Sequence, residues 1–277
     1  MNCPPAGATN LTWNDAGFWV TEAAQAISYP DDGNEICYSL EDDSFWFRHR
    51  NRILAAVLRN YPPGGDVFDV GGGNGYVATG MERAGFPTVL VEPGKSGARN
   101  AVRRGLQHVV CGTTDDAGFA PATLPAIGLF DVLEHIADDA QFLATLGQFL
   151  RPGGRIYLTV PAFQMLWSDD DQFAGHYRRY TTKTLAHALV KAGFEVEYRT
   201  YFFSFLPPPV FLLRTIPSWL GIRANTTATT AKQEHATRGG YLGRQLDGIM
   251  EWERNRLANG WTMPVGGSCL AVARWRG

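Results

Sequence analysis

The chain has 277 residues, of which 45% are hydrophobic and 19% are charged, and this composition is ordinary for a globular protein. The length allows one large domain or a core with an added cap. A formal net charge of −2 argues against a general binder of nucleic-acid phosphates, because such domains usually carry a basic excess. The 4 cysteines are scattered without C-x-x-C spacing, so we expect free thiols and a cytoplasmic protein.

The sequence carries no recognisable membrane or export segment. Its first residues lack the basic and apolar regions of a signal peptide. The most apolar stretch, residues 201–220, is broken by prolines and Arg214 before it reaches the ~20 apolar residues that a membrane span needs. We therefore expect no transmembrane segment. We favour a buried strand end followed by a cap helix there, while peripheral contact with a membrane or cover over an apolar substrate stays open.

Periodicity predicts the secondary structure in chain order. A short helix is expected over residues 16–27, and helical spacing of apolar residues predicts a second one over 44–58. Strands are then predicted at 66–70, 88–92, 108–111, 126–131, 155–160, 194–203 and 269–275, and helices at 75–84, 96–104, 138–149 and 182–192. Strands that alternate with helices through short connections predict a doubly wound, mostly parallel α/β sheet.

The loop after the first of these core strands is the most informative motif. It reads Asp69-x-Gly71-x-Gly73-x-Gly75 and leads into a helix. Glycines allow close approach of a ligand to the backbone, and a helix start offers free N–H groups. A dinucleotide fingerprint fits only loosely, with Glu92 as the acid for a ribose. The spacing agrees better with S-adenosylmethionine (SAM), which has an ammonium for an acid to hold.

Further segments in the same order carry a family resemblance. "FDVLEHI" at 130–136 and "LRPGG" at 150–154 follow the glycine loop. Together these segments resemble the class I SAM-dependent methyltransferases. The stretches 45–51 (FWFRHRN), 175–180 (GHYRRY) and the closing residues 264–274 are similar to one bacterial subgroup of that family. The resemblance implies a Rossmann-like, seven-stranded α/β sheet whose last strand is antiparallel and lies between the fifth and sixth strands.

The expected organisation has four parts. They are an N-terminal helical lid (1–60), a SAM-binding α/β core (61–203), a cap insertion that helps to form the substrate pocket (204–265) and the last core strand (266–277). Residues 242–257 are predicted to form a helix with Leu246, Ile249, Met250 and Leu257 on one face.

In an open α/β sheet, ligands lie beyond the carboxyl ends of the strands. The candidate cofactor-binding residues are therefore Asp69, Gly71, Gly73, Gly75, Glu92, Thr113, Asp115 and Asp131. Asp69 is expected to accept a hydrogen bond from a loop N–H or from the SAM ammonium. Glu92 has paired oxygens that suit two ribose hydroxyls. The adenine contact is expected within residues 112–116, where Thr113, Thr114, Asp115 and Asp116 are equally good candidates.

Methyl transfer needs an aligned acceptor, and a hydroxyl acceptor also needs a group that takes its proton. Histidine suits that task near pH 7, which makes His135 and His176 the candidate catalytic residues. Structural roles stay open for both: His135 could fix the Glu134 loop, and His176 could pair within a polar loop. A metal held by the acidic run 169–171 with a histidine is a minor alternative, and we expect no metal.

The candidate substrate-binding residues are Trp167, Arg178, Arg179 and Tyr180. The two arginines would bind an anionic acceptor, or else pair with the acidic run. We expect SAM-dependent methylation of a small molecule, with S-adenosylhomocysteine (SAH) as product. Oxygen is the favoured target atom, in a natural product, sugar or lipid-linked intermediate. The alternatives are C- or N-methylation, a non-catalytic SAM-binding subunit, and a nicotinamide-dependent oxidoreductase. The sequence does not indicate an oligomeric state.

Overall fold

The computed structural model of this chain describes residues 3–22, 38–39, 41–42, 44–221 and 241–277. The strands are β1 (Thr12–Asn14), β2 (Phe18–Val20), β3 (Val67–Val70), β4 (Thr88–Val91), β5 (Val109–Cys111), β6 (Leu124–Phe130), β7 (Leu150–Pro161), β8 (Phe194–Phe202) and β9 (Ser268–Trp275). They form one mixed sheet in the order β1-β2-β5-β4-β3-β6-β7-β9-β8.

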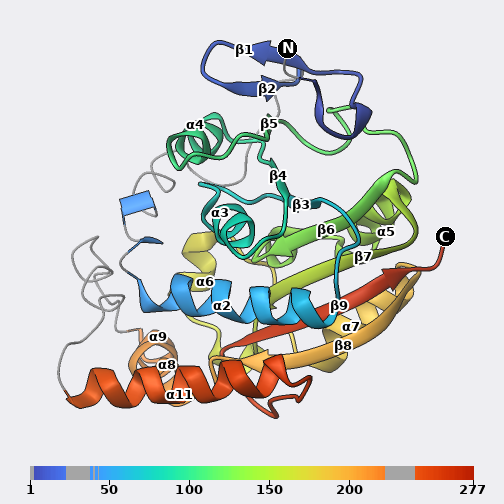
Figure 1. Cartoon of the computed structure of the whole chain (residues 1–277). Helices are drawn as coiled ribbons and strands as arrows, with labels where there is room; N and C mark the ends of the chain where they lie inside the picture. The colour runs from blue at the N-terminus through green and yellow to red at the C-terminus, as the bar shows by residue number, and fades with distance from the viewer. Residues whose placement is uncertain (1–2, 23–37, 40, 43, 222–240) are drawn as a thin grey trace.

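Helices cover both faces of this sheet (Figure 1). The longer core helices are α2 (Phe45–Asn60), α3 (Tyr76–Arg83), α4 (Lys95–Arg103), α5 (Asp139–Phe149) and α7 (Thr182–Lys191). Helices α2 and α3 pack together on one face, and α5 and α7 pack together on the other. Short helical turns are η1 (Pro5–Gly7), η2 (Leu133–His135), η3 (Gln164–Leu166) and α6 (Asp169–Ala174). The mostly parallel sheet thus has its buried core on both sides, as the alternation of elements predicts.

The strand order confirms the parallel core and corrects the expected number of strands. Strands β5, β4, β3, β6 and β7 are parallel, and β9 runs antiparallel between β7 and β8. The described sheet has nine strands rather than seven, because the N-terminal hairpin β1–β2 adds to the edge of β5. The short helix expected over residues 16–27 is wrong over 18–20, and its residues 23–27 lie outside the described part of the chain. In β2, Trp19 and Val20 pair with β5, as suits aromatic and β-branched side chains.

Strand β7 begins earlier than expected. Leu150 pairs with Leu124 and Arg155 pairs with Ala126, so the intervening residues form a bulge in one continuous strand. Gly153 has a φ of +75° in this bulge, a conformation that glycine adopts without strain. The turn predicted at this position is therefore the start of the strand rather than a connection before it.

The residues after β8 form a helical layer over α2. They are α8 (Pro207–Val210), η4 (Phe211–Thr215), α9 (Ile216–Trp219) and α11 (Tyr241–Ala258), and residues 222–240 of the expected cap lie outside the described residues. The prediction of a helix over 242–257 is confirmed, and α11 packs against α2. Its buried face contains Met250, Glu253 and Leu257, whereas Ile249 is exposed. The apolar face was therefore predicted only in part.

Glu253 attaches this layer to the core. Its Oε2 lies 2.7 Å from Nε2 of His49, and its two oxygens accept 2.8 Å hydrogen bonds from the N–H groups of Phe203 and Ser204. Both the Glu253 and the His49 side chains are almost fully buried. Glu253 thus joins α11 to α2 and to the residues after β8, and Asn60 of α2 adds hydrogen bonds to the carbonyls of Leu257 and Ala258.

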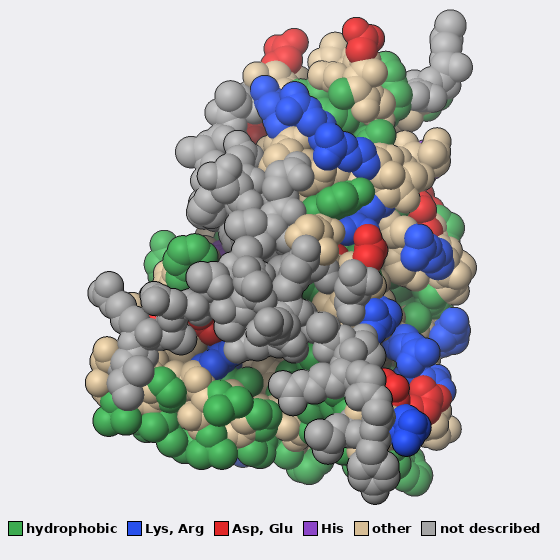
Figure 2. All heavy atoms as spheres, turned by 90° about the vertical axis from the view of Figure 1, so that its left-hand side faces the viewer, with side chains coloured by type: hydrophobic (Ala, Val, Ile, Leu, Met, Phe, Trp, Pro, Cys, Tyr) green, Lys and Arg blue, Asp and Glu red, His purple; other side chains and the backbone are tan. Residues whose placement is uncertain are grey.

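Apolar side chains are exposed at the end of the molecule that the added layer forms. Figure 2 shows hydrophobic side chains gathered at the end where Figure 1 places α8, α9 and α11. The exposed ones in this layer include Leu212, Leu213, Trp219, Leu220 and Trp252. No helix in the described part of the chain is both long enough and apolar enough to cross a membrane.

Candidate active site

The glycine loop between β3 and α3 has the conformation that its sequence requires. Gly71, Gly73 and Gly75 have φ values of +71°, +56° and +71°, where other residues are strained. A Cβ at Gly75 would lie 2.9 Å from Cβ of Ala101 in α4, whereas a Cβ at Gly73 would meet no atom of the described residues within 4 Å. Gly75 thus allows the loop to pack on α4, and Gly73 faces open space that a ligand can fill.

Asp69 lies directly beneath this loop at the end of β3. It is fully buried, and neither of its carboxylate oxygens forms a close hydrogen bond with the described residues, although the backbone N–H of Ala78 lies near enough to lower its pKa. Burial raises the pKa of Asp69 to about 7, although the positive charge of Arg50 lowers it. A buried carboxylate without a partner is costly, so the position fits the ammonium of a ligand.

Glu92, which follows β4, fastens the glycine loop to the start of α4. Its Oε2 accepts a hydrogen bond of 2.8 Å from the N–H of Gly73, and its Oε1 accepts one of 2.7 Å from the N–H of Gly94. Burial raises the pKa of Glu92, while these two N–H groups lower it. Each oxygen retains a second lone pair for a ligand hydroxyl. Binding of a ribose there stays a prediction.

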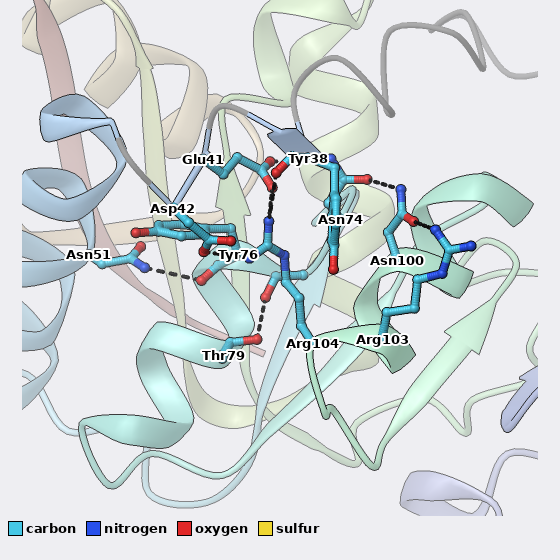
Figure 3. A network of polar contacts seen from close by, with 11 residues as sticks. Tyr38, Glu41, Asp42, Asn51, Asn74, Tyr76, Thr79, Asn100, Arg103 and Arg104 are labelled. Carbon is cyan, nitrogen blue, oxygen red and sulfur yellow. Dashed lines mark hydrogen bonds and ion pairs between the residues drawn. The ribbon is translucent and has the colours of Figure 1, made fainter. Parts of the chain in front are cut away.

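A polar network holds part of the expected lid against the loop (Figure 3). Arg104, just after α4, donates to Glu41 at 2.6 Å and to Asp42 at 2.8 Å. Asn74 of the glycine loop donates to Glu41 at 3.3 Å and accepts from Asn100 at 3.0 Å. The residue types gave no sign of this network, because its members come from three separate segments. Closure by the lid stays a prediction.

The carboxylate of Asp131, directly after β6, accepts hydrogen bonds from two other side chains of the protein. Arg50 of α2 donates to its Oδ2, and Thr159 of β7 donates to its Oδ1 at 3.2 Å. The Arg50 guanidinium also lies 4.5 Å from the centroid of the Trp46 ring, a favourable cation–π distance. The 45–51 segment therefore fixes the edge of the site through Arg50, and a contact of Asp131 with the cofactor stays a prediction.

The two candidate catalytic histidines meet beside Asp131. His135 ends the turn η2, His176 follows α6, and their ring centroids are 4.7 Å apart at an interplanar angle of 78°. Nδ1 of His176 lies 2.9 Å from Oδ1 of Asp171. Burial, and then the charge of His176, lower the pKa of His135 to about 4, so the His135 ring is neutral at pH 7. The structure thus brings both predicted residues together.

The two predicted substrate arginines are both paired with acids. Arg179 donates to Asp171 through Nε at 2.8 Å and Nη2 at 2.9 Å. Burial alone would raise the pKa of Asp171, but the hydrogen bonds from His176 and Arg179 lower it. Arg178 lies 3.1 Å from a carboxylate oxygen of Asp139. The two arginines could bind an anionic acceptor or pair with acids of the protein. The observed contacts agree with the second alternative.

The two aromatic candidates for the substrate wall differ in environment. Tyr180 is buried in the core, and its hydroxyl donates to Asp139 at 2.8 Å. Its contact with an acceptor stays a prediction. Trp167 is half-buried beside η3 and keeps an accessible surface, so its wall role stays a prediction.

The expected adenine end follows β5. Thr113 donates to Asp116 at 2.8 Å, whereas Asp115 is exposed. Thr21, just after β2, packs so closely that a Cβ at Gly112 would lie 2.4 Å from its methyl carbon. The N-terminal hairpin therefore borders this end of the site. A hollow of about 750 Å³ lies elsewhere, along β8, and includes none of the predicted site residues in its lining.

Comparison with known proteins agrees with this arrangement. The model of a family described as methyltransferase domain matches residues 41–198, more than half of the chain. A probable SAM-dependent methyltransferase of Mycolicibacterium smegmatis is 26% identical over 61% of this chain and 66% of its own length. A ubiquinone biosynthesis O-methyltransferase of Caulobacter vibrioides is 31% identical over 34% of this chain. That match spans only 40% of the Caulobacter protein.

A solved structure shares the fold. Phosphoethanolamine N-methyltransferase 2 of Haemonchus contortus, in complex with SAM, superposes with a TM-score of 0.54 and 16% identity. The superposition covers 90% of this chain and 58% of that one. The orphaned Asp69 carboxylate and the open space at Gly73 fit the same cofactor. The chain belongs to the methyltransferase-domain family, and its matches span less than two thirds of the length of these two curated relatives.

Proposed function

We propose that this enzyme transfers a methyl group from SAM to an oxygen atom of a small-molecule acceptor. The observation that carries this proposal is the pair His135 and His176, in ring contact directly beyond the end of β6. A hydroxyl must lose its proton as it is methylated, and the pair offers a place for that proton next to the cofactor side of the sheet.

The cofactor would lie along the carboxyl ends of β3 and β4. Asp69 would hold its ammonium, the open face at Gly73 would receive its amino-acid end, and the second lone pairs of Glu92 would accept from its ribose hydroxyls. The residues after β5, Thr113 and Asp115 among them, would border the adenine. SAM supplies a methyl group on a positively charged sulfur, which leaves as the neutral thioether of SAH.

His176 is the better proton acceptor of the pair. Asp171 holds its Nδ1, so Nε2 is the nitrogen left to take a proton, and the carboxylate stabilises the charge that forms. His135 binds protons weakly, because its pKa is about 4. The acceptor oxygen forms its bond to the methyl carbon as the carbon–sulfur bond breaks with its electron pair on sulfur. The acceptor proton goes to His176.

Several relatives are ubiquinone biosynthesis O-methyltransferases, and this favours oxygen over nitrogen and carbon as the atom that is methylated. The exposed apolar side chains of α9, η4 and α11 support an apolar or lipid-linked acceptor and contact with a membrane surface. The arginine pair gives no support for an anionic acceptor, since both guanidinium groups bind acids of the protein.

The test uses SAM with a trideuterated methyl group and a panel of phenols, catechols, sugars and prenylated phenols. Mass spectrometry should find one trideuteromethyl group in place of a hydroxyl hydrogen. The variant His176→Ala should bind SAH as the wild type does but lose about 10²–10⁴-fold in turnover. Transfer only to nitrogen or carbon would contradict the proposal. SAH binding without transfer to any acceptor would instead favour a non-catalytic subunit.

A further inference from the structure

Three side chains converge next to the acceptor end of the site. One ligand atom from each of Glu134, His135 and His176 lies within 4.8 Å of the other two. Glu134 and His135 are neighbours in η2, whereas His176 comes from the loop after α6. The fold alone therefore assembles this cluster.

Glu134 is the unusual member of the cluster. Its residue is 1% exposed, and its Oε2 has no hydrogen-bond partner within the described part of the chain. A buried carboxyl oxygen without a partner is costly unless a ligand completes it. The geometry points to a cation in this place.

We propose that Glu134, His135 and His176 bind a divalent transition-metal cation of the Zn²⁺, Mn²⁺, Fe²⁺ or Co²⁺ type. Two imidazoles and one carboxylate are a common ligand set of catalytic metal sites, which keep further positions open. Mg²⁺ fits less well, because it prefers oxygen ligands throughout. Metal–ligand bonds of about 2.0–2.2 Å require the three side chains to draw together from their present spacing.

Protein groups already hold the rings of both histidines. Asp171 binds Nδ1 of His176 at 2.9 Å, and Arg179 fixes that carboxylate in turn. The other ring interaction of His135 is a hydrogen bond to the backbone of Ala174. Metal-binding histidines usually donate their second N–H to a carboxylate or a backbone carbonyl. The hydrogen bonds around the two imidazoles are therefore those expected of two metal-binding histidines.

This inference deepens the proposed function and rests on it for its chemical role. A cation with open positions would bind the acceptor oxygen and lower the pKa of its hydroxyl, so that the proton leaves to solvent. His176 would then hold the metal instead of taking the proton. Acceptors with two adjacent oxygens, such as catechols, would be favoured because both oxygens reach the cation.

The experiment titrates Co²⁺ into tag-free, chelator-treated full-length protein and follows visible absorption and calorimetric heat. The wild type should bind one equivalent with the absorption bands of a nitrogen-ligated site. Glu134→Gln and His176→Ala should bind at least about 10-fold more weakly, as losses of ligands do. The matched control His108→Ala, which removes an exposed histidine before β5, should bind like the wild type. Equal Co²⁺ affinity in all four proteins would overturn the proposal.

SAH titration and a methyl-transfer assay on the same samples separate this inference from the proposed function. Loss of transfer after chelation, restored by Zn²⁺ or Mn²⁺ with SAH affinity unchanged, supports the metal site. Undiminished transfer by metal-free protein overturns the metal site and leaves oxygen methylation standing. Absence of SAH binding, with or without Co²⁺, counts against the proposed function itself.

Discussion

The carboxylate of Glu92 accepts a hydrogen bond of 2.8 Å from the backbone N–H of Gly73. The acid after the second core strand and the glycine loop after the first are therefore one structural unit. The same carboxylate also holds the N–H of Gly94 at the start of α4. A change at Glu92 must alter the loop as well as any direct contact with a ligand.

The variant Glu92→Gln is expected to weaken SAH binding about 10- to 100-fold. The amide keeps one acceptor oxygen but turns an NH₂ group toward the other N–H, and a hydrogen bond to a charged group contributes about 1.5–3 kcal/mol. Calorimetry with SAH measures the loss. Glu195→Gln, at an exposed position on β8, is the matched control and should bind SAH normally. Equal affinities would show that Glu92 does not shape the cofactor site.

The affinity for SAH is expected to rise with pH through about pH 7. The pKa of Asp69 is about 7, and a bound ammonium favours the ionised carboxylate. Below that pH the carboxyl must first lose a proton, so the affinity should fall by about tenfold per pH unit and level off above pH 7. Titrations from pH 5.5 to pH 8.5 measure the profile. In Asp69→Asn the slope should disappear, and a flat wild-type profile would assign Asp69 a purely structural role.

Alanine substitutions at the neighbouring residues Gly72 and Gly73 should affect the stability of the fold and the binding of SAH to different extents. A Cβ at Gly72 would lie 2.4 Å from Cδ1 of Leu90 and 2.5 Å from Oδ2 of Asp69, so Gly72→Ala should destabilise the fold by about 1–3 kcal/mol. In Gly73→Ala the new Cβ meets no atom of the described part of the chain within 4 Å, so we expect a cost only from the strain of its positive φ, about 1–2 kcal/mol.

Denaturant unfolding and SAH calorimetry distinguish the two variants. Gly73→Ala should remain folded at 25 °C and lose SAH affinity, because its methyl group enters the space left for the ligand. If Gly73→Ala bound SAH as tightly as the wild type, the cofactor would have to lie elsewhere.

Removal of the buried Glu253 side chain should destabilise the helical layer on α2. Glu253→Ala leaves His49 and two backbone N–H groups without their acceptor, and breaking such a buried pair costs about 3–5 kcal/mol. Glu251→Ala, on the exposed side of α11, should change stability by less than about 0.5 kcal/mol. Urea unfolding of both variants measures the difference.

The Glu253 contribution should also depend on pH. Burial alone would raise its pKa, but the hydrogen bonds from His49 and Ser204 lower it below the usual value of 4.5. The stabilisation is therefore complete above pH 4.5 and is lost as the pH falls through the lowered value. A wild-type stability that stays constant from pH 5 to pH 3, relative to Glu253→Gln, would refute this.

The sequence predicts the core well because each of its strands is a local apolar run bounded by turn residues. The strand that contains Asp69 and the one that ends before Glu92 are examples. The hairpin β1–β2 was missed, because three-residue strands are too short to show a period of two. Its place in the sheet depends on pairing with β5, far along the chain.

The sequence predicted which residues belong to the candidate site, but not which of them contact one another. The motif around Asp131 includes Glu134 and His135, yet nothing local shows that His176 lies beside them or that Arg50 occupies the Asp131 carboxylate. The same holds for Glu253, which reads as a solvated helix residue until α11 packs on His49. Such pairs are set by tertiary packing, which overrides local sequence signals.

Calorimetric and thermal-shift titration with SAH, with NAD⁺ in parallel, tests the central claim most directly. We predict that one SAH binds per chain and that NAD⁺ gives no heat. At 100 times its dissociation constant SAH should stabilise the fold by about 2.7 kcal/mol. Binding of NAD⁺ without SAH, or no response to either ligand, would contradict the assignment of the Asp69–Gly75 loop and Glu92 to SAM.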